Sequence, residues 1–139
     1  MKEIAKLKEE YNKKYNEELN NTGIFWAFGM KQFEENRTYQ KLKLNLKDYF
    51  SIGAGGYFHK RDKEKVDHFY KEIAPKLRKE FISKVDREQY IKYELANHET
   101  FYTGRTHEIY KLLKSDYADL TQEEIDKVYN KYKKNYNCY

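Results

Sequence analysis

Hydrophobic positions recur at helical spacing through most of the chain. In the first such stretch, residues 2–20, apolar side chains three or four positions apart form one stripe: Ile4, Leu7, Tyr11, Tyr15 and Leu19. Lysine and glutamate fill most of the remaining positions, and Gly23 follows the end of the pattern. We therefore expect a helix that packs through this stripe and exposes its charged face.

A longer helical pattern runs from Lys63 to about Val85, and Asp62 is placed to begin it. Its apolar positions share one face: Val66, Phe69, Tyr70, Ile73, Leu77 and Phe81. Pro75 interrupts the pattern, and an internal proline loses a hydrogen bond and clashes with the preceding turn at about 3 kcal/mol. We expect either a kink at Pro75 or a second helix that begins there.

Three further helices are predicted in the C-terminal part of the chain. Asp86 can begin a helix that runs to about Tyr102, and Gly104 suits a residue that leaves a helix in the left-handed conformation. Thr106 begins a shorter helix. The last helix follows a capping box, Thr-Gln-Glu-Glu, at residues 121–124.

Strands are predicted in the first half of the chain. Residues 24–28 are a short apolar run that favours a buried strand, with Trp26 in the core, and residues 30–35 fit a short helix. Residues 41–47 alternate leucine with lysine or asparagine, which predicts a half-buried strand with a basic outer face. Residues 49–52 can add a second strand.

These elements predict an α+β fold, a mainly helical single domain over residues 1–139 with a small antiparallel sheet built from residues 24–28 and 41–52. A length of 139 residues is close to the commonest size of one domain. Because only 39% of the residues are hydrophobic and 15 are tyrosine, aromatic rings must supply much of the core. This aromatic content argues against a fully disordered chain.

The formal net charge of +5 is compatible with an anionic partner without requiring one. The single cysteine, Cys138, excludes an intramolecular disulfide and a zinc site built on several thiolates. No apolar run approaches the roughly 20 residues that span a bilayer, and no signal-peptide pattern follows Met1. We expect a cytoplasmic protein with no membrane segment and no cofactor.

Chemically capable side chains are densest in residues 93–105. His98 and Glu99 begin like the zinc-protease motif, but Tyr102 stands where the second histidine must lie. His107 is nine residues from His98, so a metal cluster with it would require the chain to turn back. We therefore expect no metal site.

The same segment suits a metal-independent nuclease as an alternative. Glu94 lies four residues before His98 and could orient its imidazole for acid–base catalysis, with Glu99 as the third catalytic group. Phosphate could be held by Arg105, Lys60 or His59. We prefer the interpretation in which Asn97 and His98 satisfy internal hydrogen bonds, while Glu99 faces water or pairs with Arg105.

Two basic stretches offer further contacts to phosphate. The glycine-rich turn at residues 53–56 precedes Lys60 and Arg61 and could cradle a phosphate, but its spacing matches no nucleotide-binding motif and we favour a tight turn. Segment 127–136 interleaves lysine with tyrosine, and its tyrosines fall on the buried stripe of the last helix. The candidate binding residues are Asn97, His98, Glu99, Tyr102, Arg105, Gly55, Gly56, Lys60, Arg61, Lys131 and Lys134.

Three stretches carry a resemblance to known proteins. They are Phe-Trp-Ala-Phe to Gln-Phe-Glu-Glu (25–35), Ser-Ile-Gly-Ala-Gly-Gly-Tyr (51–57) and Tyr-Glu-Leu-Ala-Asn-His-Glu-Thr-Phe-Tyr-Thr-Gly (93–104). Together they resemble a family of small proteins from phages and mobile elements of low-GC bacteria, over most of the chain. The resemblance brings no functional residues with it. It implies a context, because small phage proteins often bind host defence machinery, with anti-CRISPR proteins as the best-known class.

We therefore expect a non-enzymatic counter-defence protein that inhibits a host nucleic-acid-handling complex, with an anti-CRISPR as the specific form. Its partner would be a host protein or ribonucleoprotein complex, with direct contact to RNA or DNA left open. One alternative is an RNA-binding protein or small nuclease that uses the His98 region. Another is a sponge that sequesters a nucleotide signal at the 53–56 turn with Arg61 or Arg105. The sequence leaves the oligomeric state open.

Overall fold

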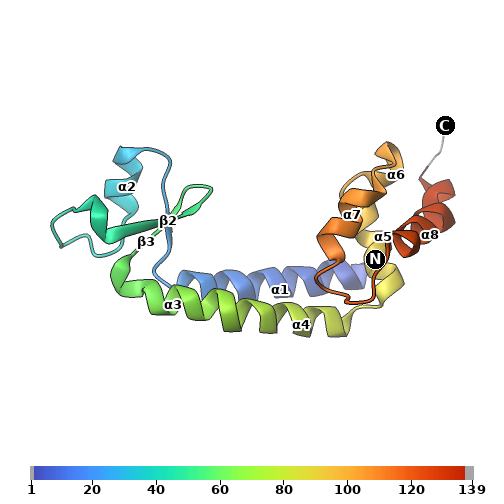
Figure 1. Ribbon diagram of the computed structural model, residues 1–139, viewed down its shortest axis with the longest axis horizontal. Helices are drawn as coiled ribbons and strands as arrows, with labels where there is room; N and C mark the ends of the chain where they lie inside the picture. The colour runs from blue at the N-terminus through green and yellow to red at the C-terminus, as the bar shows by residue number, and fades with distance from the viewer. Residues whose placement is uncertain (1, 137–139) are drawn as a thin grey trace. The chain divides into compact units, whose positions relative to one another are not determined.

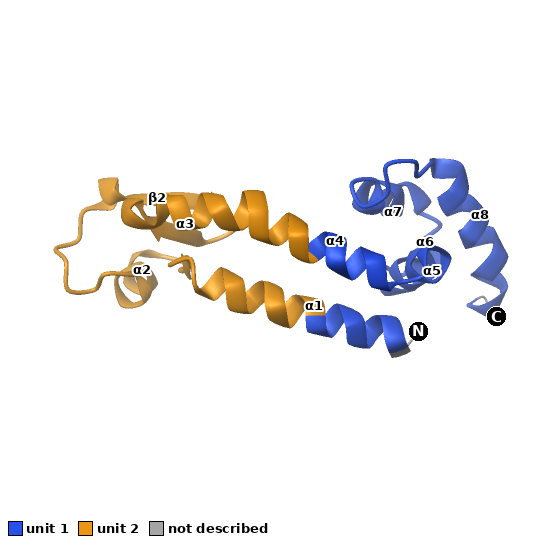
Figure 2. Cartoon of the chain, turned by 90° about the horizontal axis from the view of Figure 1, so that it is seen from below, with its two compact units in different colours: residues 1–10, 78–139 blue, residues 11–77 orange. Residues whose placement is uncertain are grey.

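The computed structural model describes residues 2–136, so Cys138 lies outside the described residues. The chain divides into two compact units, which Figure 2 colours separately. We call residues 11–77 the sheet unit, and residues 1–10 with 78–139 the helical unit. The predicted α+β class, mainly helical with a small antiparallel sheet, is confirmed (Figure 1). The prediction of a single domain stays a prediction.

The division between the units falls inside two helices. α1 spans Lys2–Asn20, as its hydrophobic stripe predicts, and α4 spans Ala74–Lys84.

Just after α1, buried Thr22 donates its hydroxyl to the carbonyl of Leu19 at 2.6 Å, and Gly23 takes a φ of +89°. Glycine suits this left-handed conformation because it has no Cβ.

Pro75 is accommodated by a π-helical turn. The helix predicted from Lys63 begins as α3 (Lys63–His68), passes through η3 (Phe69–Ile73) in π-helical form, and continues as α4. Proline has no N–H, and its ring clashes with the carbonyl four residues earlier. Since a π turn is wider than an α turn, its position just before Pro75 eases that clash. The helix therefore neither ends nor begins at the proline.

The sheet unit carries three short antiparallel strands. β1 (Phe25–Trp26) pairs with β3 (Gly56–His59), which pairs with β2 (Tyr49–Gly53), so β3 is the central strand. Ala54 and Gly55 connect β2 to β3 with φ values of +50° and +82°. Two positive φ values in succession are typical of a hairpin turn that matches the twist of its strands. The glycine-rich stretch therefore forms a tight turn, the interpretation that we favour.

The strand predicted over residues 41–47 is wrong. This segment is irregular and leads into the 3-10 helix η1 (Leu46–Asp48). Of the leucines predicted to face inward, Leu44 packs against the core, whereas Leu42 and Leu46 are 37% and 52% exposed. Alternation of apolar and polar residues therefore does not make a strand here.

Buried Arg37 gives the physical reason for the irregular segment. Its guanidinium donates hydrogen bonds of 2.7–3.2 Å to four neutral oxygens: the carbonyls of Tyr39, Gln40 and Leu42 and the hydroxyl of Tyr49. One side chain thus binds two carbonyls just before residues 41–47 and one carbonyl, that of Leu42, within them. These bonds curl the chain around Arg37 where the predicted strand would begin.

Each face of the sheet packs against its own cluster. Strand alternation places Phe25, Tyr49 and Tyr57 on one face, where they pack with Phe33 of α2 (Met30–Asn36). Strand alternation places Phe58 on the other face, where it packs with Ile24 and with Val66 of α3. The short helix predicted over residues 30–35 is confirmed by α2.

Trp26 lies at the surface instead of in the predicted core. It is 43% exposed and pairs with Gly56 across β1 and β3. A Cβ on Gly56 would lie 2.7 Å from the Trp26 ring, so the indole occupies the space that a side chain there would fill. The prediction fails because strand register, which the sequence does not show, places the indole opposite a glycine.

The helical unit contains the last helices of the chain. They are α5 (Arg87–Asn97), α6 (Thr100–Thr103), α7 (Thr106–Leu113) and α8 (Gln122–Tyr132), followed by η4 (Lys133–Asn135). Asp86 caps α5 by accepting from the Gln89 N–H at 3.0 Å, and Thr121 caps α8 by accepting from the Glu124 N–H at 3.2 Å. Both caps agree with the sequence prediction.

The helix predicted to reach Tyr102 ends at Asn97. Glu99 takes a left-handed conformation with φ of +56°, and α6 begins after it at Thr100. The left-handed conformation costs a residue other than glycine roughly 1–2 kcal/mol, so it is not expected of a glutamate. The residue types therefore do not mark this end of α5. Gly104, with φ of +73°, ends α6 as predicted.

Candidate functional site

Glu94 is the centre of the candidate site that the sequence predicts. It lies on α5, which begins at the Asp86 cap, and its side chain is only 3% exposed. The helical spacing places His98 one turn further on, at the end of the same helix. A buried carboxylate requires partners, because an unpaired charge is costly to remove from water.

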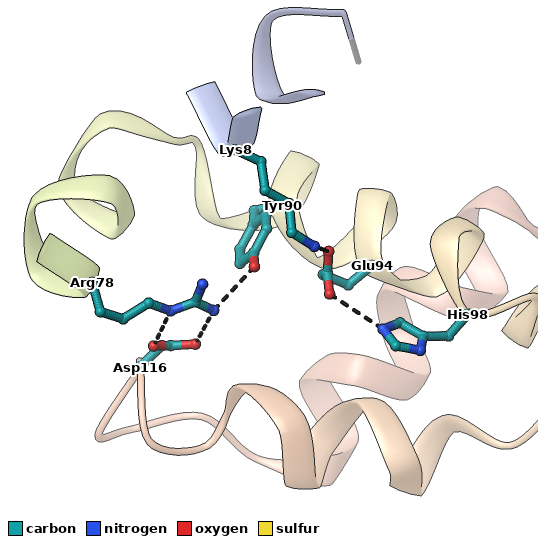
Figure 3. Close-up of polar contacts among 6 residues, drawn as sticks. All are labelled: Lys8, Arg78, Tyr90, Glu94, His98 and Asp116. Atoms are coloured by element: carbon teal, nitrogen blue, oxygen red, sulfur yellow. Dashed lines mark hydrogen bonds and ion pairs between the residues drawn. The ribbon is translucent and has the colours of Figure 1, made fainter. Parts of the chain in front are cut away.

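Lys8 and His98 are the partners of Glu94, as Figure 3 shows. The Lys8 ammonium lies 2.7 Å from Oε1 of Glu94, and His98 Nε2 lies 3.4 Å from Oε2. Lys8 also lies 5.3 Å from the ring centre of Tyr93. The predicted contact between Glu94 and His98 is therefore confirmed, whereas Lys8 is a third partner that sequence spacing does not suggest.

Glu94 contacts the His98 imidazole through one ring nitrogen, Nε2. The His98 side chain is 46% exposed, so its other ring nitrogen is accessible to a ligand or to water. Oε1 of Glu94 already accepts a hydrogen bond from Lys8 at 2.7 Å. The pair can therefore orient a histidine, while the carboxylate itself is engaged as an internal ion pair.

A second buried network lies in the same unit and is also drawn in Figure 3. Arg78 donates to both oxygens of Asp116 at 2.8 and 2.7 Å, and to the Tyr90 hydroxyl at 3.0 Å. Burial raises the pKa of Tyr90 above its usual range. Burial, the largest single effect, lowers the pKa of Arg78, but its hydrogen bonds and charge interactions with Asp116 and Tyr90 together outweigh burial and raise that pKa. This network has the geometry of a structural ion pair.

The remaining candidates of segment 93–105 lie at the junction of α5 and α6. Asn97, Glu99 and Arg105 are exposed, and Tyr102 is 73% exposed. Of the two alternatives predicted for Glu99, exposure to water agrees with the structure, while Arg105 lies 3.9 Å from Glu108 of α7. Next to these residues is a pocket of about 260 Å³ lined by Ala96, Glu99, Phe101, Tyr102 and Tyr136.

The lysines of α8 and η4 differ in their surroundings. Lys131 forms an ion pair with Glu88 at 2.9 Å, which lowers the pKa of Glu88, whereas Lys134 is exposed. The tyrosines of this segment pack inward as predicted, since Tyr129 and Tyr136 stack on the ring of Phe101 at 5.7 and 4.2 Å. Stacking platforms for bases are therefore not formed by these two rings.

The candidate binding residues of the sheet unit do not lie together in one site. Gly55 and Gly56 lie at the hairpin turn, and Lys60 and Arg61 follow the far end of β3, a strand about 13 Å long. Lys60 lies 2.9 Å from Asp48 and lowers the pKa of that carboxyl. Arg61 lies over the Tyr39 ring at 5.4 Å. The turn and the two cations are thus separate features.

Exposed apolar side chains are concentrated in the sheet unit. Seven large hydrophobic residues between positions 26 and 50 are exposed: Trp26, Phe28, Met30, Tyr39, Leu42, Leu46 and Phe50. Phe28, at 75%, is the most exposed of them. Residues 24–61 contain seven basic and three acidic residues, a net charge of +4 of the chain's +5. Sequence reasoning misses part of this surface because it assigns Trp26, Leu42 and Leu46 to the interior.

The described residues contain neither a cluster of metal ligands nor a membrane-spanning helix. Residues 2–136 contain no group of three or more His, Cys, Asp or Glu side chains placed to hold a metal ion. His107 lies 2.9 Å from the Gln122 side-chain oxygen, on α7 and α8. Every helix within residues 2–136 is too short or too polar to span a bilayer.

Comparison with known proteins identifies one family. Its model, described as a family of unknown function (DUF7659), matches residues 7–135. No curated protein and no solved structure matches this chain. The geometry of the described residues is therefore the main guide to what the protein does.

Proposed function

The chain belongs to the DUF7659 family, and we propose that it acts by binding a macromolecular partner and not by catalysis. The proposed target is a host complex that handles nucleic acid, which the protein inhibits by occupying part of its surface. The finer form of the proposal is counter-defence against a CRISPR effector. That form is supported by the resemblance to small phage proteins.

The observation that carries the proposal is the exposed surface of the sheet unit. Contiguous exposed apolar side chains commonly mark interaction sites, and Trp, Phe, Met and Tyr are enriched at interfaces. Here exposed residues of these types lie between positions 26 and 50 of the chain, within a segment of net charge +4. A positive field of this kind speeds association with an anionic partner.

Glu94 is placed to serve as an internal ion pair and not as a general base. A general base needs a free lone pair aimed at its substrate, but both oxygens of Glu94 face Lys8 or His98. The carboxylate is also buried, which makes it a suitable anchor between α1 and α5. In this proposal the polar residues before Gly104 hold the helical unit together.

The test uses the full chain, purified with a tag from cells that carry an active CRISPR effector. We expect the effector to co-purify in stoichiometric amount and its cleavage of target DNA to be inhibited. The double variant Trp26→Ala/Phe28→Ala should lose both properties. Leu112→Ala, which removes an exposed side chain of the helical unit, is the matched control and should keep them. Normal cleavage in the presence of excess wild-type protein would contradict the CRISPR form of the proposal.

A further inference from the structure

A small pocket lies in the helical unit, where α5 ends, α6 begins and the chain leaves η4. Five described residues line it: Ala96, Glu99, Phe101, Tyr102 and Tyr136. Its volume of about 260 Å³ is just below the range of roughly 300–1,000 Å³ that is usual for ligand pockets. The pocket, which we call the junction pocket, therefore suits a small ligand or one end of a larger ligand.

The walls of the junction pocket are mainly aromatic. The Phe101 side chain is 5% exposed, and its ring stacks on Tyr136 and Tyr129 with ring centres 4.2 and 5.7 Å apart. Tyr102 is 73% exposed although it lines the pocket, which places it at the opening. Because packing already holds Phe101 and Tyr136, this part of the wall needs little ordering when a ligand binds.

Glu99 supplies the charge of the junction pocket. It is the one charged residue among the lining residues that the structure describes, and its side chain is exposed. No residue in the range 2–136 forms an ion pair with it. Arg105, the nearest arginine or lysine along the chain, lies 3.9 Å from Glu108 instead. The pocket therefore presents a carboxylate to its occupant, and this charge selects a cation over an anion.

The backbone of Glu99 is fixed in an uncommon conformation. Its φ of +56° is left-handed, which is unfavourable for a residue with a Cβ. The Glu99 N–H donates to the Ala96 carbonyl at 3.1 Å, and the Glu99 carbonyl accepts from the N–H groups of Tyr102 and Thr103 at 2.9 and 3.1 Å. Residues held in strained conformations cluster at ligand sites. A glycine would fit here without strain, so the fold carries a carboxylate at this position at a cost in stability.

We propose that the junction pocket binds a quaternary ammonium group, with Glu99 beside the cation and the aromatic side chains around its methyl groups. A primary ammonium brings three N–H donors, which need acceptors that carbon walls do not provide. A quaternary nitrogen has no N–H, and aromatic walls are the means by which proteins hold choline and methylated lysine. This inference goes beyond the proposed function, which concerns the sheet unit and gives the polar residues before Gly104 a structural role.

The experiment titrates the isotope-labelled full chain with choline at low salt and follows backbone amide signals by NMR. We expect saturable shifts in residues 96–104 and at Tyr136, the part of the chain that lines the pocket. Dimethylbutanol, the uncharged analogue in which carbon replaces the choline nitrogen, should bind at least about 5-fold more weakly. That factor corresponds to the attraction of two unit charges about 4 Å apart in water.

Variants of two lining residues separate charge from ring contact. Glu99→Gln keeps the shape of the side chain and should weaken choline binding by about 5-fold or more. Tyr102→Ala should weaken it by about 2- to 5-fold, whereas Tyr102→Phe keeps the ring and should bind like the wild type. Glu108→Gln is the matched control, because it removes an exposed carboxylate outside the pocket and should change nothing. Circular dichroism checks that each variant is folded.

A second titration identifies the source of the ammonium group. The probes are a short peptide that contains trimethyl-lysine and the same peptide with unmodified lysine. Tighter binding of the methylated peptide than of choline would assign the group to a methylated protein, and weaker or equal binding would assign it to a free small molecule. Both results support the inference, provided that the unmodified peptide binds more weakly than the methylated one.

Three results would overturn the inference. The first is the absence of shifts in residues 96–104 at choline concentrations up to roughly 50 mM, where even a weak small-ligand site would fill. The second is choline binding that Glu99→Gln leaves unchanged. The third is equal binding of dimethylbutanol, which would make the pocket an apolar cavity without charge selection. Because the proposed function is tested by co-purification of a host complex, each of the two can fail while the other stands.

Discussion

Removing the carboxylate of Asp116 tests whether the buried Arg78 network holds the helical unit together. The Asp116 side chain is 6% exposed and that of Arg78 is 26% exposed, and two hydrogen bonds of 2.7 and 2.8 Å join them. Breaking a buried pair by removing one partner costs about 3–5 kcal/mol. Because a quarter of Arg78 remains in water, we expect Asp116→Ala to cost about 2–3 kcal/mol.

The companion variants locate the origin of that loss. Arg78→Met leaves Asp116 without its guanidinium and should cost a similar amount. The double variant Arg78→Met/Asp116→Ala leaves no unpaired charge, so its loss should be smaller than the sum of the two single losses by about 1–3 kcal/mol. Tyr90→Phe removes one hydrogen bond to a charged donor, at about 1.5 kcal/mol.

The assay is urea denaturation followed by far-UV circular dichroism, which reports on the helices. Free energies of unfolding at constant m-value give the coupling energy of the pair. A loss below about 1 kcal/mol for Asp116→Ala would show that solvent replaces the ion pair. Additive losses in the double variant would show that Arg78 and Asp116 stabilise the fold through other neighbours.

Four further predictions concern other features. Glu99→Gly should raise the free energy of unfolding by about 1 kcal/mol, since glycine adopts the left-handed conformation without strain; a loss would show a stabilising role for the glutamate side chain. Gly56→Ala should displace the indole of Trp26 and cost about 1–3 kcal/mol, read as a shifted fluorescence maximum; an unchanged spectrum would contradict the contact. Burial raises the pKa of Tyr90, so the stability that Tyr90 contributes is complete below its unfolded-state pKa of about 10 and is lost as pH rises through its folded-state pKa. In urea titrations at alkaline pH, the Tyr90→Phe variant should therefore lose less stability with rising pH than the wild type does. Equal losses in the two proteins would refute this. Labelled RNA should stay intact with the wild-type protein and with His98→Ala; cleavage by the wild type that the variant lacks would establish the nuclease alternative.

Elements with local causes could be predicted from the sequence. The helix over residues 2–20, the caps at Asp86 and Thr121 and the left-handed Gly104 all depend on residues close together in the chain, and all are present. The predicted strand at 41–47 fails where buried Arg37, which lies outside it, binds the carbonyls of Gln40 and Leu42 and curls the chain. Hydrophobic periodicity is judged within a short stretch of sequence, so it does not show a residue elsewhere in the chain that binds that stretch.

The candidate site shows the same limit. The contact between Glu94 and His98 follows from a spacing of four residues and could be predicted. Lys8 is 86 residues from Glu94, so its role required the tertiary structure. The exposed position of Trp26 depends on strand register, and a sequence pattern that reads the run as apolar assigns it to the interior. The sequence therefore predicted the local contact of Glu94 with His98, but neither its distant partner Lys8 nor the exposure of Trp26.

The way in which Arg37 holds its segment bears on how the surface could diversify. Its bonds to positions 39, 40 and 42 reach backbone carbonyls, which every amino acid possesses. Tyr39 and Gln40 also hold the loop through their own side chains, to Asp62 and to the carbonyl of Glu35, whereas Leu42 is 37% exposed. At position 42, therefore, the interior arginine fixes the path of the chain while the exposed side chain can be exchanged, so the surface there could change without a change of fold.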